Sequence, residues 1–376
     1  MRRAAVAFLG LGNGVGGGQH EALVIAESLK EHGHKVTLIC DSKPNFKRLE
    51  RELGVKPFFD DYFLLNWILL KNTAGFIKPL LYPVCLPTVW SGIYVNLDAG
   101  SKPFLIPLSI LLDERSSIVY HFIGAEVGKF WRADLEAHRS RRLAGTVYWS
   151  LLAEALKWIV KRIKRHGLFT AVCKFTAESV ERILGIRPRI LYGPIEWQVY
   201  RWRGEVKEDF MVSVARITPY KNLERAIYAA KTLNRRLLIL GAVRDRLYYK
   251  RLLELIRRES LGERVKIITG LPIEDRARIL RRAKVFLHCS VEGFGKSVAE
   301  AMAAGCIPVV PRLGGQSEYT PKEFHYSSIE EMLQKVEEAF NAPSSLAYNL
   351  SKSVMKFDRS LFKIRFIKLL EESELI

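Results

Sequence analysis

Short apolar runs alternate along the chain with stretches in which apolar residues recur at helical spacing. Residues 4–11 and 35–41 are strand-like runs, and residues 20–34 between them place their apolar side chains three or four positions apart. Alternation of this kind is typical of βαβ units, whose parallel strands are joined by helices. The pattern therefore predicts an α/β fold built on doubly wound parallel sheets.

The same alternation starts a second time near residue 209. Residues 197–208, which separate the two cycles, are polar and aromatic without a clear period. A chain of 376 residues is also long for one hydrophobic core and suits two domains. We therefore expect domains at residues 1–196 and 209–355, a linker at 197–208, and a closing amphipathic helix at 356–376.

Positive charge is in large excess but is not concentrated in one segment. The chain holds 59 Lys and Arg against 40 Asp and Glu, a net charge of +19, and both halves contribute to the excess. A protein that binds nucleic acid through a dedicated arm would gather this charge in one place, so we expect no nucleic-acid partner. An anionic small molecule or an anionic membrane surface fits the charge better.

The apolar segments and the cysteines indicate in which cellular compartment the protein works. The N-terminal residues lack the long apolar stretch of a secretory signal, and the uncharged residues 79–97 contain three prolines that would break a spanning helix, Pro79, Pro83 and Pro87. The five cysteines are scattered without a CxxC pair, which argues against a zinc site or a disulfide framework. We therefore expect a cytoplasmic protein without a membrane span.

The densest chemistry lies where a strand-like run ends near residue 290. The run leads into Glu292-Gly293-Phe294-Gly295-Lys296 and then into a helix that carries Glu300. The glycines let the backbone approach a ligand closely, and the N-terminus of the helix, with Lys296, favours an anion. Glu292 is suited to accept hydrogen bonds from hydroxyl groups of a bound molecule.

Two interpretations stay open for Glu300. It can contact a ligand, for example the hydroxyl pair of a ribose. Alternatively, Ser297 to Glu300 is a capping box, in which Ser297 caps the helix and Glu300 reaches back to the Ser297 N–H. The spacing alone does not separate these roles.

Two cations flank a second loop, after the strand that ends near Ala215. Arg216 and Lys221 stand on either side of Pro219, ahead of the next helix. Two positive side chains at the carboxyl end of a strand can clamp a diphosphate, through charge-assisted hydrogen bonds of about 1.5–3 kcal/mol each. The alternative is a pair of solvated surface cations.

A glycine-rich loop follows the first strand-like run. Gly16, Gly17 and Gly18 stand where backbone N–H groups can meet a phosphate or a sugar. The same loop also fits the dinucleotide fingerprint GxGxxG, with its glycines at 12, 14 and 17 and an acidic residue, Asp41, at the end of the next strand. This second fit motivates a rival hypothesis, a nicotinamide-dependent oxidoreductase.

Two further features carry a functional and a structural interpretation each. His121, at the carboxyl end of a strand-like run, can orient a substrate hydroxyl or serve the core. Residues 139–165 combine arginines and lysines with Trp149 and Trp158, as in a helix that lies in a membrane interface. The alternative for this segment is a solvated helix face over the core.

Together these residues resemble one family of enzymes. The stretch EGFGKSVAEAMAAGCIPVVPRLGGQSE, residues 292–318, resembles the E-x7-E signature and the following Gly-Gly-x-x-Glu loop of the retaining GT-B glycosyltransferases of family 4. Arg216 and Lys221 fall where that family has its diphosphate clamp. Gly16 and Gly17 match its N-terminal glycine loop, and His121 matches its active-site histidine.

The resemblance implies a fold and a set of roles. It implies two Rossmann-like domains, with an acceptor-side N-terminal domain, a donor-binding C-terminal domain and a final helix that crosses back to the N-terminal domain. Arg216 and Lys221 would neutralise the leaving diphosphate, and Glu300 would hold the ribose. Glu292 and the amides of residues 294–296 would hold the donor sugar and its phosphate, and His121 would line the sugar site. The resemblance implies no metal and no cofactor besides a nucleotide-diphosphate sugar as co-substrate.

Three short stretches favour one branch of that family. Residues 119–124, 173–180 and 190–196 look similar to the mannosyltransferases that extend dolichol-linked oligosaccharides on the cytosolic membrane face. This similarity implies GDP-mannose as donor, a lipid-linked acceptor and peripheral attachment to that membrane face. Two residues depart from the pattern: Asn222 stands where glycine often follows the lysine, and Gln316 where those enzymes often carry proline. A UDP-sugar donor with a soluble or other acceptor is therefore the alternative.

Overall fold

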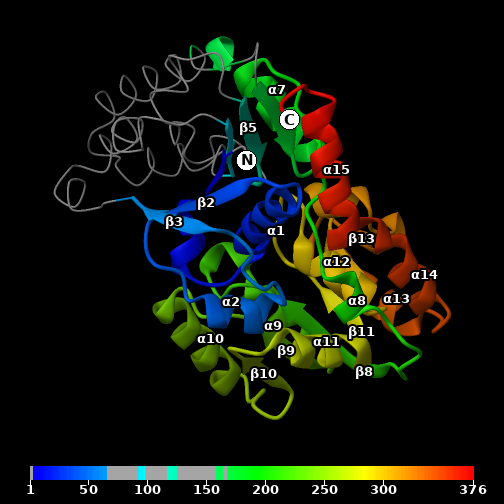
Figure 1. The fold of residues 1–376 in the computed structure, drawn as a ribbon. Helices are drawn as coiled ribbons and strands as arrows, with labels where there is room; N and C mark the ends of the chain where they lie inside the picture. The colour runs from blue at the N-terminus through cyan, green and yellow to red at the C-terminus, as the bar shows by residue number, and fades with distance from the viewer. Residues whose placement is uncertain (1–2, 66–91, 98–116, 125–157, 159, 164–166) are drawn as a thin grey trace, which may run out of the picture. The chain divides into compact units, whose positions relative to one another are not determined.

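The computed structural model describes residues 3–65, 92–97, 117–124, 158, 160–163 and 167–376. Its chain divides into two compact units (Figure 1). The N-terminal unit comprises Met1–Leu49, Val55–Tyr192 and Phe362–Ile376, and the C-terminal unit comprises Glu50–Gly54 and Gly193–Leu361.

The described part of the N-terminal unit contains a parallel sheet with the order β3-β2-β1-β4-β5-β6-β7. The central strands β4 and β5 are buried along almost their whole length, as expected for a parallel sheet that is covered on both faces. The strands are β1 (Arg3–Ala7), β2 (Lys35–Cys40), β3 (Asp61–Leu64), β4 (Gly92–Asn96), β5 (Ser117–Phe122), β6 (Gly167–Ala171) and β7 (Arg189–Ile190). The helices described in this part of the chain are η1 (Leu9–Asn13), α1 (Gly17–Glu31), α2 (Phe46–Leu53) and α7 (Lys174–Leu184).

The C-terminal unit contains a second parallel sheet, with the order β10-β9-β8-β11-β12-β13. Its strands are β8 (Glu208–Val214), β9 (Arg236–Leu240), β10 (Val265–Ile268), β11 (Ala283–Leu287), β12 (Ile307–Pro311) and β13 (His325–Tyr326). The α-helices are α8 (Trp197–Tyr200), α9 (Leu223–Thr232), α10 (Arg246–Arg258), α11 (Ile273–Arg282), α12 (Lys296–Ala303), α13 (Ile329–Asn341) and α14 (Leu346–Ser353). Short 3-10 turns complete the unit: η3 (Pro219–Lys221), η4 (Gly315–Glu318), η5 (Lys322–Phe324) and η6 (Met355–Phe357). The two sheets confirm the predicted α/β fold with doubly wound parallel sheets.

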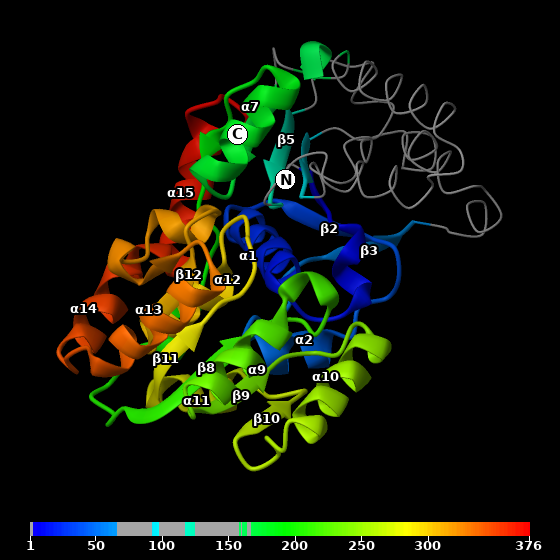
Figure 2. The ribbon, with the colours of Figure 1, turned by 180° about the vertical axis from the view of Figure 1, so that it is seen from behind.

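The helices of the C-terminal unit form two groups. Helix α9 contacts both α10 and α13, whereas α8 contacts α11 and α12. Strands β8 and β11 lie side by side in both views (Figure 1, Figure 2), and the chain winds outward from this pair in both directions. The strand order therefore reverses between β8 and β11, and ligands of open α/β sheets bind beyond the carboxyl ends of strands at such a reversal.

Two segments near the domain boundaries belong to units that the order of the chain alone does not indicate. Residues 197–208, suggested as a linker, include α8 and belong to the C-terminal unit, where the Trp202 amide donates to the Ala303 carbonyl at 2.8 Å. Helix α15 (Arg359–Glu371) leads into the N-terminal unit, where Lys363 pairs with Glu31 at 2.7 Å and Ser117 Oγ donates to the Leu375 carbonyl at 3.3 Å. The C-terminal residues thus pack with the first part of the chain.

Candidate active site

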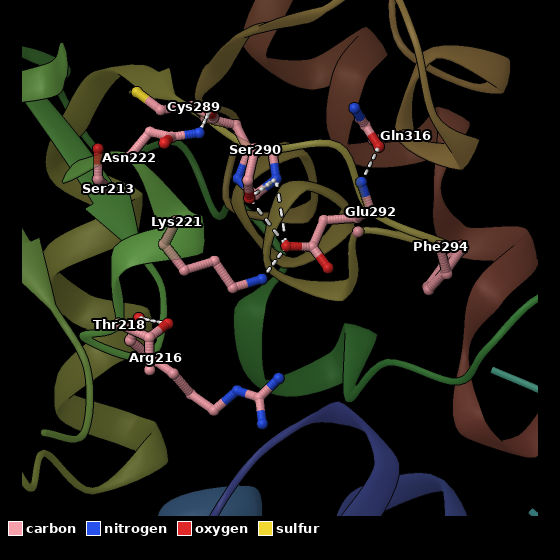
Figure 3. A network of polar contacts seen from close by, with 12 residues as sticks. Ser213, Arg216, Thr218, Lys221, Asn222, Cys289, Ser290, Glu292, Phe294 and Gln316 are labelled. Atoms are coloured by element: carbon pink, nitrogen blue, oxygen red, sulfur yellow. Dashed lines mark hydrogen bonds and ion pairs between the residues drawn. The ribbon is translucent and has the colours of Figure 1, made fainter. Parts of the chain in front are cut away.

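The loops that follow β8 and β11 bring Lys221 and Glu292 together (Figure 3). Lys221 ends η3, and its side chain is only 8% exposed. Its ammonium group forms an ion pair and a hydrogen bond with Glu292 Oε1. The interpretation of Lys221 as a solvated surface cation is therefore wrong.

Asn222 holds the first loop against the second. Its backbone has φ = 50°, in the left-handed region that glycine and asparagine adopt most readily. Its side-chain amide donates to the Cys289 carbonyl at 3.2 Å, just beyond the end of β11. The asparagine can therefore stand in place of a glycine here, and it adds a bond between the loops that a glycine lacks.

His288 and Ser290 lie beside the same carboxylate, although no sequence pattern singled them out. Ser290 Oγ donates to Glu292 Oε1 at 2.9 Å, and His288 Nε2 lies 3.8 Å from the same oxygen. Burial lowers the pKa of His288 from 6.5 to about 4; the charge of Glu292 opposes this shift and that of Lys221 supports it. His288 is therefore neutral at neutral pH.

Glu292 is ionised in this environment. Burial raises the pKa of its carboxyl group, but the charge of Lys221 and the hydrogen bonds from Lys221 and Ser290 lower it by more. The net result is a pKa below the usual glutamate value. About a quarter of the Glu292 side chain, 25%, stays exposed, so the carboxylate is accessible as well as charged.

The turn from Glu292 to Gly295 is fixed by the segment around Gln316. Gln316 is fully buried; it accepts a hydrogen bond from the Glu292 N–H at 3.1 Å and donates to the Leu313 carbonyl at 2.6 Å. A Cβ atom on Gly295, whose φ is 75°, would lie 2.8 Å from the Gln316 Cβ. The glutamine thus supplies hydrogen bonds that a proline at this position lacks, and the glycine lets the two segments approach.

Glu300 does not take part in a capping box. Helix α12 begins at Lys296 with Gly295 at its N-cap and no side-chain cap, so Ser297 lies inside the helix and that interpretation is wrong. Glu300 is 5% exposed, and its Oε1 lies 3.6 Å from Lys296 Nζ. Gly293 and Phe294 are buried in the turn that leads into this helix.

Arg216 differs from Lys221 in being exposed. No carboxylate within the described ranges pairs with its guanidinium group, which lies 5.9 Å from the centre of the Tyr220 ring. Figure 3 shows the Arg216 and Lys221 side chains extending in the same direction from the loop after β8. A positive group without a countercharge therefore stands next to the Lys221–Glu292 pair.

The N-terminal unit contains three of the predicted site residues, Gly16, Gly17 and His121. Gly16 is the N-cap of α1, and Gly17 is exposed in its first turn. His121, at 1% exposure, uses both ring nitrogens: Nε2 lies 2.9 Å from Glu21 Oε1, and Nδ1 lies 2.7 Å from Thr170 Oγ1. Sequence reasoning missed Glu21 and Thr170. The sugar-binding roles of Gly16, Gly17 and His121 stay predictions.

The first glycine of the dinucleotide fingerprint serves packing. A Cβ atom on Gly12 would lie 2.1 Å from Ser42 Oγ and 2.4 Å from the Ser42 carbonyl oxygen. The 3-10 turn η1 also separates β1 from α1, whereas the fingerprint places the loop directly between strand and helix. The local geometry therefore gives the oxidoreductase hypothesis no support.

Most of the predicted membrane-interface segment, residues 139–165, lies outside the described residues. Trp158, which is described, is 59% exposed. Among the described helices, none combines the length and the apolar character needed to cross a membrane. Within the same residues, no three His, Cys, Asp or Glu side chains gather as a candidate metal site.

Comparison with known proteins places this site in a family domain. Residues 201–350 match the family model described as "Glycosyl transferases group 1". Over 207 residues the chain is 25% identical to a "GDP-Man:Man(3)GlcNAc(2)-PP-Dol alpha-1,2-mannosyltransferase" of Dictyostelium discoideum. This match covers 48% of the chain and 41% of that relative, well under two thirds of its length.

Solved structures show the same architecture over nearly the whole chain. HepE of Anabaena in complex with UDP-glucose gives a TM-score of 0.71 at 16% identity, covering 99% of this chain and 100% of HepE. Sucrose-phosphate synthase of Thermosynechococcus elongatus gives a TM-score of 0.72 at 15% identity, covering 99% of each chain. Residues 201–350 thus match the glycosyl transferases group 1 model, and the structural matches show that the two Rossmann-like units of the chain have the GT-B fold.

Proposed function

We propose that this protein is a glycosyltransferase that moves a sugar from a nucleotide-diphosphate donor to an acceptor hydroxyl group. The observation that carries the proposal is the cluster at the strand reversal of the C-terminal unit. There Lys221 and Glu292 pair beside the unpaired cation Arg216, within the residues that match the family model. This cluster combines positive charge for a diphosphate with an ionised carboxylate for sugar hydroxyls.

Each group has a proposed role. Arg216, Lys221 and the N-terminus of α12 bind the diphosphate, because fixed positive charges and the positive end of a helix dipole favour an anion. Glu292 and the amides of residues 294–296 bind the sugar and its phosphate. Glu300 binds the ribose, next to Lys296.

We propose a retaining reaction that proceeds without a metal ion. The acceptor hydroxyl attacks the anomeric carbon on the face from which the diphosphate leaves, and the leaving phosphate takes its proton. Negative charge develops on that phosphate, so preorganised positive groups lower the barrier. Arg216 and Lys221 are those groups in this site.

For donor and acceptor we propose GDP-mannose and a lipid-linked oligosaccharide, at the cytosolic face of a membrane. The similarity to the GDP-Man:Man(3)GlcNAc(2)-PP-Dol alpha-1,2-mannosyltransferase of Dictyostelium discoideum supports this choice. A UDP-sugar with a soluble acceptor is the second candidate, because the HepE structures contain UDP and UDP-glucose. The two candidates differ in the base, the sugar and the acceptor.

Two measurements on the full chain test the proposal. Thermal unfolding with GDP, UDP or NAD identifies the nucleotide: stabilisation by GDP or UDP supports a transferase, and stabilisation by NAD alone contradicts it. Transfer assays then compare GDP-mannose with UDP-glucose on a pyrophosphate-lipid-linked oligosaccharide and on the same oligosaccharide in water. Activity that survives EDTA supports the metal-independent mechanism, and loss of activity with EDTA contradicts it.

A further inference from the structure

The two lysines of the site lie against its two glutamates. Lys221 pairs with Glu292, and Lys296 Nζ lies 3.6 Å from Glu300 Oε1. Of the three cations Arg216, Lys221 and Lys296, only Arg216 lacks a carboxylate partner within the described residues. A diphosphate carries negative charge on both phosphates, so Arg216 alone does not neutralise it.

The two carboxylate oxygens of Glu292 differ in their contacts. Its Oε1 accepts hydrogen bonds from Lys221 and Ser290 and lies 3.8 Å from His288 Nε2. No described residue bonds to its Oε2, and Figure 3 shows this second oxygen directed away from the Lys221 ammonium. The Ser290 hydroxyl and the bond from the Glu292 N–H to Gln316 do not depend on Lys221. The carboxylate can therefore stay in place when Lys221 turns to another anion.

We propose that the Lys221–Glu292 ion pair is exchanged when the donor binds. In this inference, which rests on the proposed function, the diphosphate replaces Glu292 as the partner of Lys221. The released carboxylate then accepts hydrogen bonds from the hydroxyls of the donor sugar. Opening the ion pair costs free energy, and the sugar offsets that cost only while it is attached to the diphosphate.

This exchange gives Glu292 a role in discrimination. A nucleotide sugar replaces both partners of the broken pair, whereas the product nucleoside diphosphate replaces only the partner of Lys221. Glu292 therefore weakens binding of the product relative to the donor and favours its release. Simple recognition of sugar hydroxyls by Glu292 does not predict any gain in product affinity when the carboxylate is removed.

The test is calorimetric titration of GDP and UDP, and of GDP-mannose and UDP-glucose, into the wild type and Glu292→Gln. We expect Glu292→Gln to bind the nucleoside diphosphate about tenfold more tightly, the order of one charge-assisted hydrogen bond. The preference for the nucleotide sugar over the nucleoside diphosphate should fall. Unchanged or weaker diphosphate binding by a folded Glu292→Gln overturns the exchange.

Two further variants separate the exchange from simple charge repulsion. In a Lys221→Met background, Glu292→Gln should no longer tighten diphosphate binding; a gain that persists there overturns the inference, because it shows direct repulsion by Glu292. Glu259→Gln is the matched control, since Glu259 pairs with Lys231 and its side chain is 24% exposed, against 25% for Glu292. It should leave nucleotide binding unchanged, and an equal gain there also overturns the inference.

Failure of this inference is distinguishable from failure of the proposed function. If the wild type binds neither GDP nor UDP, the result contradicts both the proposed function and the ion-pair exchange. If the wild type binds a nucleoside diphosphate and transfers sugar while Glu292→Gln binds it no better, only the exchange falls. Melting curves of each variant confirm that a changed affinity belongs to the folded protein.

Discussion

Two polar clusters stand near the carboxyl ends of parallel strands, one in each unit, and they differ in how exposed their side chains are. In the N-terminal unit, both ring nitrogens of His121 are bonded, and His121 and Glu21 are 1% and 7% exposed. In the C-terminal unit, Glu292 is 25% exposed, and Arg216 beside it is exposed.

The difference indicates which cluster has polar groups that can turn to a ligand, namely the exposed Arg216 and the partly exposed Glu292 of the C-terminal unit. A buried cluster whose histidine is bonded at both ring nitrogens contributes mainly to the fold, because opening it leaves donors or acceptors unpaired in the interior. An exposed charge next to a partly exposed carboxylate gains partners when a ligand arrives. We therefore expect substitutions in the C-terminal cluster to change binding, and substitutions in the N-terminal cluster to change stability.

The largest effect is expected for Lys221→Ala. The variant loses a charge-assisted hydrogen bond to the diphosphate, worth about 1.5–3 kcal/mol, but it also has no ion pair with Glu292 to open, which offsets part of that loss. Nucleotide affinity should therefore fall by about tenfold. Calorimetric titration measures this fall. Lys231→Ala is the control, because Lys231 is 53% exposed and pairs with Glu259. Equal affinities for Lys221→Ala and the wild type would remove Lys221 from the donor site.

The sequence predicted the parts of this binding cluster but not their connections. Alternating strand and helix patterns indicated two parallel sheets, and the glycine turn and the cations marked the loops after β8 and β11. The pairing of Lys221 with Glu292 depends on β8 and β11 being neighbours, although β9 and β10 lie between them in the chain. Only the strand order, which local periodicity does not encode, brings these loops together.

Other residues escaped prediction because their types looked ordinary in their positions. The sequence pattern placed His288 and Ser290 at the end of a predicted strand and Gln316 in a predicted loop. Glu21 lies in α1 and contacts His121 of β5, and a local pattern does not reveal such a long-range contact. The capping box predicted at Ser297 is wrong for a different reason. Its residues have the spacing of the motif, but the helix begins before Ser297, at Lys296.

A second effect, on stability, is expected for Glu21→Ala. The variant leaves the His121 ring nitrogen that faces Glu21 without a partner in the interior, which costs about 1–3 kcal/mol. For a unit of this size, each kcal/mol lowers the melting temperature by roughly 2–4 °C. Nucleoside diphosphate affinity should stay at the wild-type value, as the comparison between the clusters requires.

Two variants control that measurement. Glu21→Gln keeps an oxygen acceptor for His121 and should lose less stability than Glu21→Ala. Glu31→Ala, on the same helix, removes a 48% exposed partner of Lys363 and should cost about 0–1 kcal/mol. If Glu21→Ala melts like the wild type but binds nucleotide less well, the buried cluster is a ligand site and the comparison is wrong.

The smallest effect concerns pH and the buried His288. Its pKa falls from 6.5 to about 4 on folding, mainly through burial, so between these values the unfolded chain binds the additional proton. Stability from this group is therefore complete above about pH 6.5 and is lost as the pH falls towards 4. Between pH 7.5 and pH 5 the loss is about 2 kcal/mol, or roughly 4–8 °C in melting temperature.

His288→Gln should remove this part of the acid sensitivity. Lys221 and Glu292 face His288, and Glu292, with a pKa below its usual value, loses its contribution only at pH values below this window. The difference between the melting temperatures at pH 7.5 and pH 5 should therefore shrink in His288→Gln, whereas in His32→Gln, at an exposed position, it should match the wild type. An unchanged difference in His288→Gln would mean that His288 takes up its proton without unfolding. The carboxylate of Glu292 would then share its charge with a histidinium as well as with Lys221, and it would be less free to turn to a ligand than the comparison requires.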